Sequence, residues 1–168
     1  NNQNIKIITP AQYGLSSFAW HFILKLWKER KEFCVYIDGG LIKKAAVTKN
    51  INSQLSVFNV KQEDVKRIII DNWTLSNKDS KQILATITQD YPQIPILILC
   101  PMLEKTLLET ENMTTTEFNF SILYMAPLQT CQIRSIVEIY NRHKYIGQND
   151  IVLKRLDADI QNFNMHRT

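Results

Sequence analysis

The chain has 168 residues, of which 45% are hydrophobic and 21% charged, with only 4 Gly and 5 Pro. These values exclude a disordered, collagen-like or low-complexity chain, and they predict a domain of ordinary size with a buried core. Twenty Lys and Arg against 16 Asp and Glu give a net charge of +4. Because the basic residues are scattered along the chain, the sequence gives little reason to expect a nucleic-acid partner.

The three cysteines, Cys34, Cys100 and Cys131, are far apart and show no CxxC spacing. This pattern argues against a disulfide framework and a zinc site, and it favours a reducing, cytoplasmic setting. Cys34 and Cys100 lie in apolar runs and are expected in the core. No stretch approaches the ~20 apolar residues that span a bilayer, so no membrane segment is expected. The absence of an initiator Met suggests a segment of a longer protein.

Five short apolar runs predict β-strands, at Ile5–Thr9, Phe33–Asp38, Arg67–Asp71, Ile96–Cys100 and Ser121–Ala126. The runs are almost continuously apolar instead of alternating, which is typical of strands covered on both faces in a parallel sheet. Helical spacing between them predicts helices at Ser16–Arg30, Leu41–Phe58 and Ser80–Tyr91, with Val60–Lys66 leading into the third strand. The sequence therefore predicts an α/β fold, a five-stranded, mostly parallel sheet with helices on both faces.

After Pro127 the pattern is helical only, with predicted helices at Thr130–Tyr140 and Asn149–Asn162. This tail is too short for a domain of its own. We therefore expect an α/β domain over residues 1–128 and the beginning of a truncated helical subdomain over residues 129–168.

The loop between the first strand and the first helix is a candidate phosphate site, because free N–H groups and the helix dipole favour an anion there. A P-loop requires Gly, four residues, Gly, Lys and then Ser or Thr. Gly14 and Ser16 occupy the second Gly and hydroxyl positions, whereas Thr9 and Leu15 replace the first Gly and the Lys. An ordinary turn in which Ser16 or Ser17 caps the helix explains the same residues about equally well.

The third strand ends in Asp71, which is a candidate to hold magnesium through water. Many ATPases place a second acidic residue next, but this chain has Asn72, whose amide cannot act as a general base. Arg134 and Arg167 could each reach a phosphate, although surface ion pairs are the favoured alternative for both. The three Trp residues are expected to anchor the core or a domain interface; they are Trp20, Trp27 and Trp73.

Taken in order, these segments resemble the P-loop ATPase core of bacterial STAND proteins, the NACHT-like signal-transduction ATPases. The segments that carry the resemblance are Ile7–Ser17, Arg67–Asn72, Pro95–Cys100, Leu123–Leu128 and Gln132–Arg134. The resemblance implies a P-loop NTPase-like, nucleotide-binding module between an effector and a sensor, which switches or oligomerises, often in antiviral defence. It also implies ATP or ADP with magnesium as ligands. The implied phosphate contacts are Gly14, Leu15, Ser16, Ser17 and Arg134, and the implied magnesium ligands are Ser16 and Asp71.

Leu15 and Asn72 mark a degenerate site, so we expect at most weak ATP hydrolysis and name no confident catalytic residue. The expected partners are the chain's own effector and sensor domains and further copies of itself. An alternative, for which Leu15 is the best support, is an interaction scaffold that keeps the P-loop fold without nucleotide. A flavodoxin-like or receiver-like domain has the same element count and is less favoured, since a receiver needs acidic residues where Thr9 and Pro10 stand.

Overall fold

The structure is a computed structural model and describes residues 3–10, 14–74, 79–102, 118–126, 129–144 and 147–162. The chain divides into two compact units, Asn1–Met125 and Ala126–Thr168.

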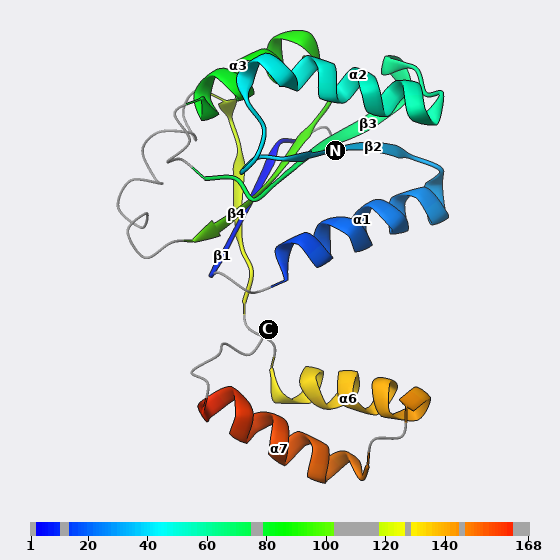
Figure 1. The fold of residues 1–168 in the computed structure, drawn as a ribbon, viewed down its shortest axis with the longest axis vertical. Coiled ribbons are helices and arrows are strands. Elements are labelled where there is room, and N and C mark those ends of the chain that lie inside the picture. Colours follow the sequence, from blue (N-terminus) through cyan, green and yellow to red (C-terminus); the bar gives the residue numbers. More distant parts are fainter. Residues whose placement is uncertain are drawn as a thin grey trace. The chain divides into compact units, whose positions relative to one another are not determined.

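The first unit is built on a parallel sheet of five strands with the order β2-β3-β4-β1-β5 (Figure 1). All the described strand pairs are parallel, which confirms the predicted fold class. The strands are β1 (Ile5–Pro10), β2 (Phe33–Asp38), β3 (Val65–Asp71), β4 (Ile96–Met102) and β5 (Ser121–Tyr124). All five lie where the apolar runs predicted them, although β3 begins and β5 ends two residues earlier than expected.

Helix α1 (Leu15–Arg30) covers one face of the sheet, and α2 (Val47–Phe58) and α3 (Ser80–Asp90) cover the other (Figure 1). The predicted helix at Leu41–Phe58 is in fact a short 3-10 turn, η1 (Lys44–Ala46), followed by α2, and a second turn, η2 (Gln62–Asp64), precedes β3. Lys31 and Asn59 end α1 and α2 with φ of 56° and 51°. Their N–H groups bond carbonyls of the last turn, a usual way for a helix to stop.

The core has two apolar layers because alternate residues of each buried strand point to opposite faces. Ile68 and Ile70 of β3 face α2 and α3, where they pack with Trp73 and Leu84. Ile69 faces α1 and belongs to a second cluster, which also contains Ile7, Leu15, Ala19, Leu97 and Leu99. Each fully buried large side chain contributes roughly 1.5–3 kcal/mol, so these layers are the main source of stability.

The second unit is a pair of helices, α6 (Thr130–Lys144) and α7 (Asn149–Asn162), and α6 runs past its predicted end at Tyr140. Ile133 and Val137 of α6 pack against Leu153 of α7. At the turn between the helices, Asn141 Nδ2 donates a 2.6 Å hydrogen bond to Oδ1 of Asn149. In the described parts of both units, no helix is long and apolar enough to cross a membrane.

Candidate functional site

The first element of the site is the N-terminus of α1, at the carboxyl edge of the sheet. Gly14 caps the helix with φ of 73°, a left-handed conformation that favours glycine, and its carbonyl accepts the N–H of Phe18 at 2.8 Å. The first N–H groups of a helix have no acceptor within it and attract anions. Ala11, Gln12 and Tyr13, which complete the predicted loop, lie outside the described residues.

The expectation that Ser16 or Ser17 caps α1 is wrong. The helix begins at Leu15 after Gly14, and no side chain makes a capping hydrogen bond to it. The two serines are therefore the second and third helical residues, and Ser17 is exposed. The left-handed glycine makes the turn and so moves the helix start one residue earlier.

Leu15, which stands where a P-loop has its lysine, is only 7% exposed. Its side chain belongs to the α1-side core together with Ile7, Leu97 and Leu99. This position therefore supplies packing and no positive charge, so Leu15 can contact a phosphate only through its backbone N–H.

The second element of the site is Asp71, at the carboxyl end of β3 and fully buried. Its Oδ2 accepts a 2.8 Å hydrogen bond from the hydroxyl of Tyr36, and its Oδ1 accepts one of 2.8 Å from the N–H of Asn72. Burial raises the pKa of Tyr36, and the hydrogen bond to Asp71 raises it further. The phenol therefore stays protonated and keeps donating to the carboxylate.

Asn72 follows Asp71 in a left-handed conformation with φ of 52°. Its side chain is exposed, whereas its backbone N–H is bound to Asp71. The position that often holds a second acid thus contributes a backbone donor and a neutral amide.

Two aromatic residues that the sequence did not place in the site are connected to Asp71. Trp20 of α1 stacks on Tyr36 of β2, with ring centroids 4.6 Å apart and planes at 27°. The only sequence signal was a tyrosine inside the apolar run of β2. Of the three tryptophans expected in the core or at a domain interface, Trp73 is fully buried in the core, whereas Trp20 and Trp27 are about half exposed.

The buried polar residues of β1 were also missed. Lys6 is fully buried, and burial lowers its pKa, while the neighbouring Cys100 acts in the opposite direction. A single Lys inside the apolar run of the first strand was the available signal. Cys34 and Cys100 are buried as predicted, and burial raises the pKa of the Cys34 thiol to about 11.

Asp71 is the acidic residue at this edge that the sequence predicts as a magnesium ligand. No group of three or more His, Cys, Asp or Glu side chains in the described part of the chain could hold a metal ion. Mg²⁺ is commonly bound through one or two carboxylates plus substrate phosphates and water. Each oxygen of Asp71 accepts one described hydrogen bond and keeps a second lone pair, so this carboxylate can serve as one such group.

Arg134 belongs to the second unit, where its guanidinium lies 3.7 Å from a carboxylate oxygen of Asp150. Both side chains are mostly exposed, so this is a surface ion pair of the kind that contributes little to stability. Arg167 lies outside the described residues.

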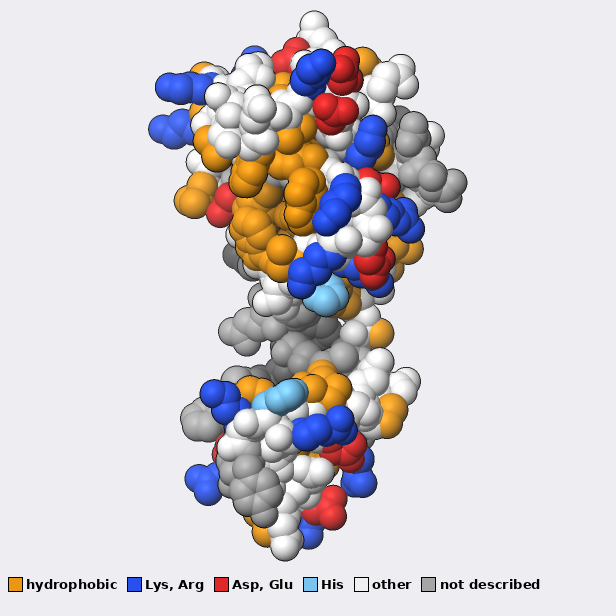
Figure 2. Space-filling view, turned by 90° about the vertical axis from the view of Figure 1, so that its right-hand side faces the viewer, with side chains coloured by type: hydrophobic (Ala, Val, Ile, Leu, Met, Phe, Trp, Pro, Cys, Tyr) orange, Lys and Arg blue, Asp and Glu red, His pale blue; other side chains and the backbone are white. Residues whose placement is uncertain are grey.

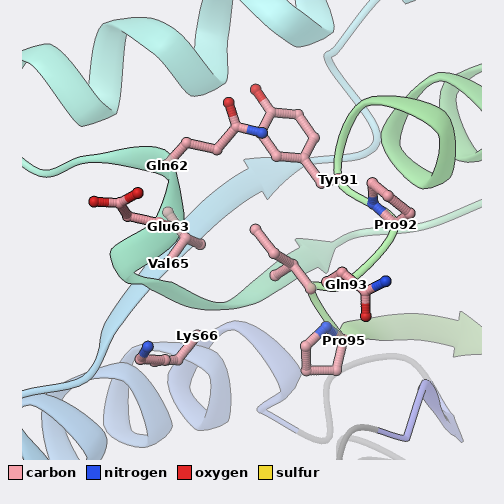
Figure 3. Close-up of a pocket in the computed structure, with 9 residues that line it drawn as sticks. Gln62, Glu63, Val65, Lys66, Tyr91, Pro92, Gln93 and Pro95 are labelled. Atoms are coloured by element: carbon pink, nitrogen blue, oxygen red, sulfur yellow. The ribbon is translucent and has the colours of Figure 1, made fainter.

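A groove of about 670 Å³ lies at the opposite, amino edge of the sheet. Figure 3 shows its lining, which comes from the start of β3 and from the turns that precede β3 and β4 and includes Gln62, Lys66, Tyr91 and Pro95. Glu63 and Lys66 are its only charged groups among the lining residues. The groove therefore does not coincide with the strand ends that carry Gly14 and Asp71.

No protein-family model and no curated protein matches this sequence. Among solved structures, the chain is similar to the replication initiator DnaA bound to AMPPCP and single-stranded DNA, with 13% identity and a TM-score of 0.61. It is also similar to AMPPCP-bound DnaA from Aquifex aeolicus, with 12% identity and a TM-score of 0.63. The matches cover 92% of this chain and 50% and 49% of those chains, so it spans about half their length. At this level of identity the likeness concerns the fold alone, which is a five-stranded parallel α/β sheet with helices, consistent with a P-loop NTPase-like fold.

Proposed function

We propose that this chain is a degenerate nucleotide-binding module that takes ATP or ADP with magnesium and hydrolyses it weakly or not at all. The observation that carries the proposal is the placement of Gly14 and Asp71. A glycine-capped helix begins after β1, and a buried carboxylate ends β3, both at the carboxyl edge of a parallel sheet. Ligands of open α/β sheets bind at this edge.

In this proposal the phosphates lie against the backbone N–H groups of Gly14, Leu15, Ser16 and Ser17. Ser16 and Asp71 hold the magnesium ion, which bridges the phosphates, and Arg134 remains a candidate phosphate contact. The two DnaA structures with AMPPCP support nucleotide as the ligand class, since their fold is the same. Slow hydrolysis follows from Asn72, because an amide cannot take a proton from the attacking water.

The biological role that we propose is a switch or oligomerisation platform in a larger signalling or antiviral-defence protein of the STAND type. The order of the segments from Ile7–Ser17 to Gln132–Arg134 supports this role. Effector and sensor domains would belong to the rest of that protein. Neither DNA binding nor its absence is part of the proposal, although one of the similar DnaA structures contains single-stranded DNA.

A second candidate function is a scaffold that keeps the fold without nucleotide. Two observations favour it: Leu15 is packed in the core, and both oxygens of Asp71 already accept hydrogen bonds within the protein. A site that has lost its ligand would be expected to satisfy its polar groups internally in this way.

Calorimetric titration of ATP and ADP with magnesium separates the two candidates when the chain is compared with Leu15→Lys. The stem of a lysine can stay in the pocket of Leu15 while its ammonium reaches the loop. Nucleotide binding by the unmodified chain, strengthened in Leu15→Lys and not in the control Leu15→Met, supports the module. Absence of binding by all three folded proteins supports the scaffold.

A further inference from the structure

Helix α1 carries three large apolar residues that the described part of the first unit covers only in part. Trp20, Leu24 and Trp27 are 52%, 52% and 47% exposed. At about 100° per residue, their spacing of four and three places them within roughly 60° of one another on the helix. A helix that packs on a sheet normally carries charged and polar residues on its solvent side. The apolar stripe on α1 therefore indicates a surface that a partner covers.

Further aromatic side chains lie on the edge strand β2 and at the end of α2. The ring of Trp20 stacks on Tyr36 on one side of β2, and Phe33 lies 5.4 Å from Phe58 of α2, centroid to centroid, on the other. Phe58 is 62% exposed. We call this surface the aromatic face and define it by Trp20, Leu24, Trp27, Phe33, Tyr36 and Phe58.

Figure 2 looks at the first unit from the side where α1 and α2 end and β2 begins. Hydrophobic side chains gather there, and Lys and Arg side chains run along one side of them. Large apolar patches with a polar rim are typical of interaction sites.

The partner does not extend the sheet, because Gln54 blocks the middle of the edge strand. Its Nε2 donates a 2.6 Å hydrogen bond to the carbonyl of Tyr36, and its Oε1 accepts the N–H of Tyr36 at 3.1 Å. These are two of the backbone groups with which an added strand would pair, at the middle of β2. A partner on this face therefore contacts side chains.

The charged residues beside the aromatic face indicate the net charge of its partner. Lys28 and Lys31 are exposed beside Leu24 and Trp27 on the helix, and the ammonium of Lys31 lies 5.6 Å from the ring centre of Trp27. Glu29, the one acidic residue of α1, lies half a turn away from Trp20. Such exposed lysines attract carboxylates, whereas a second copy of this chain would bring lysines against lysines.

Two features favour a protein segment over single-stranded nucleic acid. Bases stack on open ring faces, but one face of Trp20 is already covered by Tyr36, and Lys31 lies over Trp27. Leu24 between them offers aliphatic surface, which suits the apolar side of an amphipathic helix.

We propose that the aromatic face binds an acidic amphipathic helix of a protein partner. The apolar side chains of that helix pack on Trp20, Leu24, Trp27 and Phe58, and its Asp and Glu residues face Lys28 and Lys31. The proposal is independent of nucleotide binding and stands whether or not Gly14 and Asp71 hold a ligand.

The test begins with a display library of helical peptides selected on the full 168-residue chain. We expect enriched sequences with apolar residues at helical spacing, flanked by Asp and Glu. A synthetic peptide of the consensus sequence is then titrated while tryptophan fluorescence is followed, since Trp20 and Trp27 are the half-exposed indoles. Leu24→Glu, Trp27→Ser and Lys28→Glu should each weaken binding by about tenfold or more.

The matched controls are Leu41→Glu and Lys44→Glu, which alter an 81% exposed leucine and an exposed lysine outside the aromatic face. They should leave binding unchanged, and circular dichroism should show that every variant is folded. Enriched peptides without acidic residues, or peptides that bind Leu24→Glu as tightly as the unmodified chain, would overturn the proposal. It would also be overturned if oligo(dT) bound this face and displaced the peptide while the peptide alone bound only weakly.

Discussion

The hydroxyl of Tyr36 and Oδ2 of Asp71 lie 2.8 Å apart, on the neighbouring strands β2 and β3. Asp71 is fully buried, and Trp20 covers the ring of Tyr36. The hydrogen bond therefore connects the half-exposed surface of α1 with the carboxylate on which the proposed magnesium site depends.

Tyr36→Phe should lower the free energy of unfolding by about 1–3 kcal/mol, because a buried carboxylate loses one of its donors. Urea denaturation monitored by circular dichroism measures this change. Tyr124→Phe is the control, since Tyr124 on β5 is mostly exposed, and it should leave stability unchanged. Equal stability of Tyr36→Phe and the unmodified chain would show that the bond does not hold Asp71 in place.

Stability should fall in alkaline solution partly through Cys34. Its thiol ionises near 9.0 in the unfolded chain and at about 11 in the folded one. Between these pH values the unfolded state has released a proton that the folded state keeps, so stability decreases as pH rises, by up to about 1.4 kcal/mol per unit, and below this window the effect is absent. Urea denaturation from pH 8 to 11 should therefore show a shallower loss for Cys34→Ala than for the exposed control Cys131→Ala. Parallel curves for the two variants would contradict this.

Leu15→Ala should destabilise the fold by about 2–5 kcal/mol, as expected when a packed leucine leaves a cavity. The control Leu41→Ala removes a leucine that is 81% exposed and should change stability by less than about 0.5 kcal/mol. Thermal and urea unfolding of both variants measure the difference. If Leu15→Ala left the free energy of unfolding unchanged, the side chain of Leu15 would have to face the loop instead of the core.

Gly39→Ala should destabilise the end of β2, because the added Cβ would lie 2.9 Å from the carbonyl oxygen of Asp71 and 3.1 Å from Cε3 of Trp73. A backbone oxygen cannot turn away, so we expect a cost of about 1–3 kcal/mol. Gly40→Ala is the matched control, since its Cβ would meet nothing closer than 3.4 Å. Equal stability of the two variants would contradict the close packing of Gly39.

The sheet could be predicted from the sequence because its strands are continuous apolar runs, such as Ile68–Ile70, that only a doubly covered sheet accommodates. Strand order was not predictable, since it depends on which crossovers form. Helix boundaries differ from the predicted ones where a local backbone conformation interrupts the apolar periodicity. The left-handed Gly14 lets α1 begin at Leu15, and the 3-10 turn at Lys44–Ala46 replaces the first part of one expected helix.

The candidate site was predictable only as positions along the chain. Gly14 and Asp71 follow from the rule that strand ends form the crevice. The contacts around Asp71 could not be predicted in this way. Tyr36 and Trp20 belong to different elements and meet only when α1 packs on β2. Likewise, half-exposed tryptophans cannot be told from buried ones by spacing alone, and so Trp20 and Trp27 were expected in the core or at a domain interface.

The proposed function depends on Asp71 as a ligand of a magnesium nucleotide. Calorimetric titration of ATP with and without magnesium into the unmodified chain and Asp71→Asn tests it most directly, because the amide keeps the shape and one acceptor but removes the charge. We predict that magnesium strengthens ATP binding by about tenfold in the unmodified chain and has little effect in Asp71→Asn. The same magnesium effect in both folded proteins, or no ATP binding by the unmodified chain, would contradict the account.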